Sequence, residues 1–379
     1  MKKQVDENTY AFDYIIYYGL DRVPEQGEGI SVVVLDSSWF HPDKHGIFGK
    51  MAPQVDGNGE SAREYSHFNF HGIMVATLIN GQPRPDIFFY GGTAPKALVH
   101  LIDIRDMHDY FDIPTLFSTA AQRGHIIVRS GNFQQKQGGK GWTEEDSERV
   151  YRILDAQDAI LIITAGNDAY YQDGIGMTEE TQWMHKLVKH PKLMSRVLVV
   201  ANFEPLGEYE ASVGMRMMRA RELVGQYPGQ PEDPVDMGIV EEMLVKVMSR
   251  PIARMFIRMK LKYIDNVRQL NDRLRSRPHF CKKGRIVSYT AGIMRNHCVF
   301  VAGCDIYTIG QFGEMRSNDG SSEAAPIMAG MFARFVQQRK TDENTYGDLL
   351  ELFKTHYCEP LGEDQNIWGL GAPSTKFLN

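Results

Sequence analysis

Four polar residues, far apart in the chain, are of the types that activate a serine for attack on an acyl bond. Ser322 lies in SNDGSSEAAPIMAG, Asp36 ends SVVVLD, His71 begins HGIMVA and Asn167 lies in ITAGND. A serine hydroxyl is a weak nucleophile and needs a neighbouring base, and histidine suits that role because its ordinary pKa is ~6.5. A carboxylate orients the histidine, and an amide can donate to the oxyanion. The set predicts acyl-bond cleavage by serine chemistry.

Each of these residues also has a simpler structural explanation. Asp36 follows an apolar run, and such an Asp often ends a parallel strand. His71 precedes a glycine, as loop and helix-start histidines do, and Asn167 suits a turn. Ser322 suits the N-cap of a helix. The order of all four along one chain is what favours catalysis.

Five segments resemble the subtilisin-like serine peptidases, or subtilases. They are GEGISVVVLDS (27–37), HGIMVA (71–76), GTAPKALV (92–99), TAGND (164–168) and GSSEAAPIMAG (320–330). The order Asp, His, Ser is that of subtilisin. The resemblance implies a triad of Asp36, His71 and Ser322, with Asn167 as oxyanion donor. It also implies a three-layer fold that requires no cofactor. Family members often bind structural calcium, but no acidic loop identifies a calcium site, so the chain predicts no metal ligands.

The chain departs from the family pattern near two of these residues. Ser321 replaces the usual threonine and keeps a hydroxyl. Glu323 follows the expected nucleophile, where an apolar or small residue is usual. Its carboxylate would add negative charge near the oxyanion unless it points away. Ser38 and Trp39 replace the glycine that usually lies two residues after the Asp, so the shape of that loop is open.

The resemblance also points to residues that would contact a polypeptide substrate. Ser130, Gly131 and Asn132 match the strand that pairs with an extended substrate backbone. Asp168 matches the foot of the main specificity pocket. A carboxylate there predicts a preference for Lys or Arg before the scissile bond.

Short apolar runs alternate with polar, often helical stretches along the chain. This alternation predicts an α/β fold with a mostly parallel central sheet and helices on both faces. Catalytic residues then lie at the carboxyl ends of strands, where Asp36 and Asn167 fall. The expected strands are 30–35, 97–102, 125–128, 159–163 and 197–200.

The long stretch between the Asn167 and Ser322 segments predicts an insertion. We divide the chain into an N-terminal extension (1–26), a catalytic domain (27–203 and 296–379) and a basic, largely helical insertion (204–295). Between 241 and 285 there are 13 Lys and Arg against 4 Asp and Glu, in a chain of net charge -6. The insertion could therefore bind a regulatory protein or another anionic partner. Alternatively, these cations only solvate the outer faces of docked helices.

Composition and cysteine usage suggest where the protein works. No apolar run reaches the 18 residues of a membrane span, and MKKQVDENTY lacks the apolar core of a secretory signal. Four cysteines without CxxC spacing indicate reduced thiols and a cytoplasmic setting. The segment before Gly27 is too short for a folded inhibitory propeptide, which suggests selective, partner-controlled activity.

Three hypotheses follow for the function of this chain. The first is an intracellular serine endopeptidase. The second is a subtilase-fold binding or regulatory protein whose activity is latent or lost. The third is an esterase with the same triad, which would cleave esters but not peptides.

Overall fold

The computed structural model describes residues 2–4, 10–37, 46–60, 71–104, 112–131, 133, 142–167, 174–177, 181–205, 280–281, 284–309, 314–374 and 376. The chain divides into two compact units: Met1–Glu204 with Ile286–Asn379, and Pro205–Arg285. Most of the second unit, and with it most of the expected basic insertion, lies outside the described residues. The fold set out below is that of the first unit, while β9 (Phe280–Cys281) and most of β10 (Gly284–Ile286) belong to the second.

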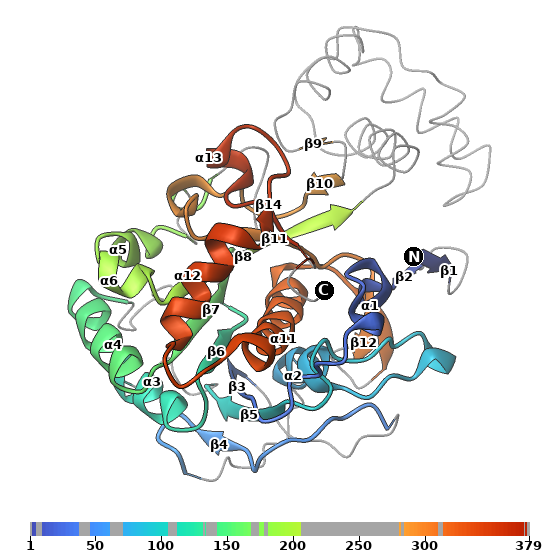
Figure 1. Cartoon of the computed structure of the whole chain (residues 1–379), viewed down its shortest axis with the longest axis horizontal. Helices are drawn as coiled ribbons and strands as arrows, with labels where there is room; N and C mark the ends of the chain where they lie inside the picture. Colours follow the sequence, from blue (N-terminus) through green and yellow to red (C-terminus); the bar gives the residue numbers. More distant parts are fainter. Residues whose placement is uncertain are drawn as a thin grey trace, which may run out of the picture. The chain divides into compact units, whose positions relative to one another are not determined.

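A parallel sheet forms the centre of this unit (Figure 1). Seven of its strands pair in parallel in the order β4-β5-β3-β6-β7-β8-β11. Buried Val, Ile and Leu fill the inner strands, as expected for a sheet covered on both faces. The predicted mostly parallel sheet is confirmed. The strands are β3 (Ser31–Asp36), β4 (Val55–Asp56), β5 (Leu98–Asp103), β6 (Ile126–Arg129), β7 (Ile160–Thr164), β8 (Val197–Pro205) and β11 (Cys298–Ala302).

Helices cover both faces of the sheet. On one face, α2 (His71–Asn80) and α11 (Ser321–Arg339) share a core with alternate strand residues such as Val32 and Val34. The intervening residues, such as Val33, point to the other face because side chains alternate along a strand. There α3 (Ile113–Ala121) packs on β3 and on α4 (Glu144–Ala156). The predicted three-layer architecture is confirmed.

The remaining elements are further helices, 3-10 turns and antiparallel strand pairs. The helices are α1 (Tyr14–Tyr17), α5 (Met184–Val188), α6 (Pro191–Met194), α12 (Tyr346–His356) and α13 (Gln365–Trp368), with 3-10 turns at Leu20–Arg22, Pro85–Ile87 and Gly292–Met294. The antiparallel pairs are β1 (Lys2–Gln4) with β2 (Tyr10–Phe12), β9 (Phe280–Cys281) with β10 (Gly284–Ile286), β12 (Ile306–Ile309) with β13 (Met315–Asn318), and β14 (Cys358–Glu359) with β15 (Ala372–Pro373). Among the helices that the structure describes, none has both the length and the apolar character needed to cross a membrane.

The segment predicted as an N-terminal extension packs into the core of the first unit. Phe12, Tyr14 and Tyr18 are buried there. The hydroxyl of Tyr14 donates to the carbonyl of Gly91 over 2.5 Å, and the hydroxyl of Tyr18 accepts from the amide of Ala302 over 2.8 Å. Each hydroxyl thus has a partner, as a buried tyrosine requires. Residues 10–26 therefore help to close the side of the fold that carries α2 and α11.

The chain leaves and re-enters the first unit at neighbouring points. The amide of Val287 donates to the carbonyl of Asn202 over 3.1 Å, and the amide of Asn202 donates to the hydroxyl of Ser288 over 2.8 Å. The two ends of the intervening stretch are therefore anchored side by side in the first unit.

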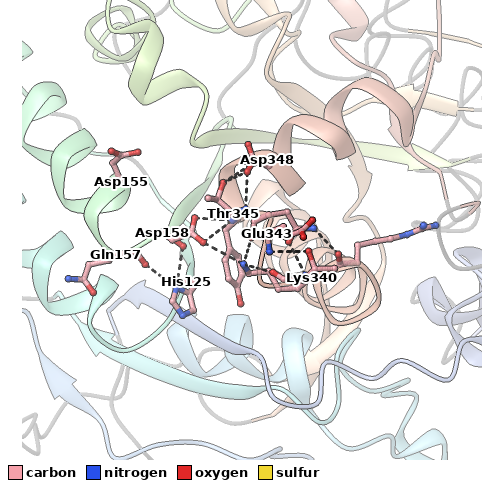
Figure 2. A network of polar contacts seen from close by, with 12 residues as sticks. His125, Asp155, Gln157, Asp158, Lys340, Glu343, Thr345 and Asp348 are labelled. Carbon is pink, nitrogen blue, oxygen red and sulfur yellow. Dashed lines mark hydrogen bonds and ion pairs between the residues drawn. The ribbon is translucent and has the colours of Figure 1, made fainter.

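A polar network fixes α12 at the amino end of the sheet (Figure 2). Asp158 accepts from the Tyr346 amide over 2.9 and 3.1 Å and from the Arg196 guanidinium over 2.9 Å. The ring of His125 stacks on Tyr346 with centroids 4.6 Å apart. Thr345 caps the helix in a reciprocal pair with Asp348. The network lies before β6 and β7, away from the edge where Asp36 ends β3.

Candidate active site

Asp36 and His71 form a hydrogen-bonded pair at the carboxyl edge of the sheet. Asp36 is the last residue of β3 and is 2% exposed, and His71 is the first residue of α2. Nδ1 of His71 lies 2.8 Å from Oδ2 of Asp36. The other carboxylate oxygen accepts from the amide of Ser37 over 2.7 Å. Because Nδ1 then carries the proton, the neutral ring has its lone pair on Nε2, which is the arrangement a general base needs.

Ser322 is the second residue of α11, which packs against α2. Both His71 and Ser322 therefore lie at the N-terminal ends of neighbouring helices. The hydroxyl of Ser130, just after β6, donates to the Ser322 carbonyl over 3.3 Å. The positive end of the α11 dipole lies beneath Ser322, where it favours developing negative charge.

Asn167 is held against the start of α11 by Ser321. Its Oδ1 accepts from the Ser321 amide over 2.7 Å and from the Ser321 hydroxyl over 2.9 Å. A backbone amide can only donate, so this contact identifies the oxygen of the side chain and leaves Nδ2 as its donor end. Gly166, directly before Asn167, has φ +96°, a conformation that favours glycine. The turn after β7 thus directs Asn167 towards α11.

Glu323 is buried within the same helix start rather than pointing to solvent. It is 5% exposed. A Cβ placed on Gly320 would lie 2.7 Å from Oε2 of Glu323 and 3.0 Å from Nδ2 of Asn167. The carboxyl and the amide thus flank the same backbone carbon. Burial raises the pKa of Glu323 to about 7, although the charge of His71 acts to lower it.

The pKa of His71 is set by opposing effects. Burial lowers it, whereas the charge of Asp36 and the hydrogen bond to it raise it, as does the charge of Glu323. The charge of Arg129 lowers it. The net direction is upward from the ordinary value.

Arg129, the last residue of β6, is a half-buried cation that the sequence analysis did not identify. Its Nη1 donates to the Leu35 carbonyl over 3.1 Å, and its guanidinium lies 5.5 Å from the centroid of the Phe133 ring. Burial lowers the pKa of Arg129, and the charge of Asp36 opposes this change. A Cβ on Gly131 would lie 2.7 Å from the guanidinium, so Gly131 leaves room for it. The feature of the sequence that could have identified Arg129 is its place as a charged residue at the end of an apolar run.

The structure describes most, but not all, of the predicted site residues. Ser130 and Gly131 follow β6, and Ser130 contacts the backbone of Ser322. Asn132 and Asp168 lie outside the described residues, as do Ser38 and Trp39.

No metal site emerges in the part of the chain that the structure describes. No group of three or more His, Cys, Asp or Glu side chains there could hold an ion. Structural calcium is therefore not assigned to any residues. Cys298, Cys304 and Cys358 carry free thiols.

Comparison with known proteins identifies relatives of the chain. The family model described as "Subtilase family" matches residues 27–350. No curated protein sequence matches the chain significantly.

Several solved structures share the fold at low sequence identity. MycP1 from Mycobacterium smegmatis has a TM-score of 0.52 at 15% identity, with 100% of this chain and 87% of that chain covered. The prenylagaramide maturation protease PagA has a TM-score of 0.51 at 16% identity, covering 96% and 95%. Fervidolysin from Fervidobacterium pennivorans, a keratinolytic enzyme related to subtilisin, has a TM-score of 0.52 at 13% identity, covering 95% and 45%.

Proposed function

Since the chain belongs to the subtilase family of serine endopeptidases, we propose that it cleaves polypeptides with Ser322 as nucleophile, His71 as general base and Asp36 as the orienting carboxylate. The observation that carries this assignment is the 2.8 Å contact between His71 Nδ1 and Asp36 Oδ2. It holds the imidazole in the tautomer that accepts a proton at Nε2. The packing of α2 on α11 supports the role of Ser322, because each helix carries one of the two residues at its N-terminal end.

The proposed reaction follows from these roles. Ser322 Oγ attacks the substrate carbonyl carbon while its proton passes to Nε2 of His71. Asp36 stabilises the imidazolium, and the proton then passes to the leaving amine. Water, deprotonated by His71, hydrolyses the acyl-enzyme by the same route.

Asn167 is the proposed side-chain donor to the oxyanion. Two hydrogen bonds from Ser321 fix its Oδ1, which supports an amide whose Nδ2 is preoriented before substrate binds. Preorientation matters because the donor then costs no reorganisation when charge develops. The hydroxyl of Ser321, at the position where the family usually has threonine, thus helps to orient the Asn167 amide.

Substrate contacts are proposed at two places. Ser130, Gly131 and Asn132 would pair with an extended substrate backbone, and Asp168 would favour Lys or Arg before the scissile bond. Cleavage rates for matched peptides with Lys or Leu at that position test the second point, and equal rates would remove it.

We further propose that the enzyme is cytoplasmic and is controlled by an anionic partner at its basic insertion. The cluster of Lys and Arg between 241 and 285 supports such a partner. Reversing the charges of Arg254, Arg258, Lys260 and Lys262 should abolish co-purification of that partner, and unchanged co-purification would remove this part of the proposal.

A second candidate is a regulatory protein with latent or lost activity. The buried carboxyl of Glu323, directly after Ser322, is the observation that favours it. Unfolded casein and a small ester are each incubated with the parent protein and with Ser322→Ala. Mass spectrometry of the casein fragments and release of the alcohol from the ester separate the functions. Serine-dependent internal cleavage supports the endopeptidase. Ester turnover without peptide cleavage would indicate an esterase, and the absence of both would indicate the regulatory protein.

A further inference from the structure

The backbone turn before Ser322 is bonded to the loop that follows β11. The amide of Gly320 donates to the carbonyl of Gly303 over 2.9 Å, and the amide of Asp305 donates to Oδ1 of Asp319 over 2.5 Å. Asp319 and Gly320 directly precede α11, whose second residue is Ser322. The loop after β11 therefore holds the backbone that leads into the proposed nucleophile.

This loop and the start of α11 are also packed closely against each other. A Cβ on Gly303 would lie 2.6 Å from the carbonyl oxygen of Gly320 and 3.0 Å from the Cβ of Ala324. The next residue along the chain, Ser321, donates its amide to Oδ1 of Asn167 over 2.7 Å. Because close-packed segments transmit displacements, a shift of the loop would also move the start of α11 and its contact with Asn167.

The N-terminal segment (10–26) is bonded to both ends of the same loop. The amide of Phe12, at the end of β2, donates to the carbonyl of Asp305 over 2.7 Å. The hydroxyl of Tyr18, directly after α1, accepts from the amide of Ala302 over 2.8 Å. Both side chains are buried in the core of the first unit. In addition, β2 lies beside β12, which continues from this loop (Figure 1).

We infer that the N-terminal segment holds the nucleophile in place, and that Tyr18 is a positioning residue that acts on Ser322 through the loop after β11. This inference rests on the proposed function of the same site. One path runs from Tyr18 through the loop to Gly320, and a second runs from Phe12 through Asp305 to Asp319.

The effect on the reaction follows from the geometry that serine attack requires. Without the Tyr18 hydroxyl, the Ala302 amide loses an acceptor in a buried place, and the loop shifts to restore a partner. A shift of a fraction of an ångström at Gly320 moves Ser322 relative to the proposed base His71. Such misplacement slows the chemical step, because the reacting atoms must be aligned before attack.

Two tyrosines of the N-terminal segment provide a matched pair of variants. Tyr18→Phe removes one hydroxyl and keeps the ring. Tyr14→Phe makes the same change at a residue that is also buried, but the Tyr14 hydroxyl donates to the carbonyl of Gly91 over 2.5 Å. Gly91 belongs to the loop between α2 and β5, not to the loop after β11. Each variant loses one buried hydrogen bond, so we expect similar decreases in melting temperature.

The first readout is the rate at which Ser322 reacts. In Tyr18→Phe, the rate of labelling by a fluorophosphonate and the kcat for a peptide should both fall about tenfold, with KM nearly unchanged. Tyr14→Phe should react at the parent rate, although it is destabilised to the same extent. If the parent reacts, equal rates for the two variants overturn the inference.

A second readout does not need an active enzyme. Amide hydrogen exchange, measured by NMR in the Ser322→Ala background, should become roughly tenfold faster at Gly320 and Ser321 when Tyr18→Phe is added. It should not change at these amides when Tyr14→Phe is added.

The exchange rates separate this inference from the proposed function. Faster exchange at Gly320 and Ser321 supports it even if the parent cleaves nothing, in which case only the proposed function fails. Unchanged exchange overturns it even if the parent is a protease. Melting curves identify a variant that does not fold, and Asp319→Ala, which removes the acceptor of the Asp305 amide, then replaces Tyr18→Phe with the same expected results.

Discussion

At the scale of single residues, the environment of His71 combines charges of opposite sign. Asp36 and Glu323 raise its pKa, and Arg129 lowers it. Arg129 is half-buried, with one nitrogen donating to the Leu35 carbonyl, so its charge is only partly screened by solvent. Arg129 and Glu323 therefore shift the base in opposite directions.

Replacing Arg129 by Met should shift the pH dependence of peptide hydrolysis. Without the charge of Arg129 the pKa of His71 rises, so more of the ring is protonated at a given pH. The acid limb of kcat/KM should move to higher pH by about half a unit to one unit. A pH series of peptide hydrolysis measures this shift. Arg22→Met, which removes an exposed cation, is the control; an acid limb that stays in place in Arg129→Met would contradict the account.

The pair of Asn167 and Ser321 gives a graded prediction. Asn167→Ala removes the oxyanion donor and should lower kcat about 100- to 1,000-fold with little change in KM. Ser321→Ala removes only one of the two contacts that hold the amide, so its loss of kcat should be several-fold. Steady-state kinetics on one peptide measures both. Equal losses in the two variants would show that the Ser321 hydroxyl does more than hold Asn167.

At the scale of elements, the attachment of α12 depends on one acidic side chain. Asp158 accepts from the amide of Tyr346, the first residue of α12, and from Arg196, whose side chain is only 9% exposed. Asp158 also has φ +46°, which Asp and Asn adopt more readily than most residues. Asp155 is the other carboxylate on Arg196, and its side chain is 50% exposed.

Loss of the Asp158 carboxylate should destabilise the fold. Asp158→Ala leaves Arg196 with one exposed partner and removes an acceptor from the start of α12, so unfolding should become easier by about 2–3 kcal/mol. Asp155→Ala should cost less than about 1 kcal/mol, because that pair is exposed to solvent. Urea denaturation of the three proteins tests this order. Similar losses for the two variants would contradict it.

At the scale of the whole molecule, the point where the chain leaves the first unit lies next to the point where it returns to it. Asn202, before the second unit, is hydrogen-bonded to Val287 and Ser288 after it. All the described residues of the proposed site belong to the first unit. The first unit thus contains the proposed chemistry and both anchors of the intervening stretch.

Replacing residues 206–283 by a short Gly/Ser linker should preserve the first unit. Because the two ends of the replaced stretch are already anchored side by side in the first unit, the linker closes a small gap at little entropic cost. We expect one cooperative thermal transition and reaction of Ser322 with an acyl probe at the parent rate. Loss of cooperative unfolding would show that the second unit is needed for the first to fold.

The sheet was predictable from sequence, whereas several charged and aromatic positions were not. Runs such as Val32 to Leu35 are apolar on both faces, so they predict a covered parallel strand directly. Arg129 and Glu323 are of types usually found at the surface, and only the assembled fold shows that Glu323 is buried and Arg129 half-buried. The sequence analysis likewise placed Tyr14 and Tyr18 in an N-terminal extension. Their burial was not predictable, because the groups that bond to their hydroxyls lie far away in the sequence.

The most direct test of the central claim is covalent labelling of Ser322 by a fluorophosphonate. This probe reacts with a serine whose hydroxyl is activated by a neighbouring base. We predict that the parent protein is labelled and that mass spectrometry places the label on Ser322, with no label on Ser322→Ala and little on His71→Ala. Absence of label on the folded parent at every pH between 6 and 9, or equal labelling of parent and Ser322→Ala, would contradict the assignment of Ser322 as the nucleophile.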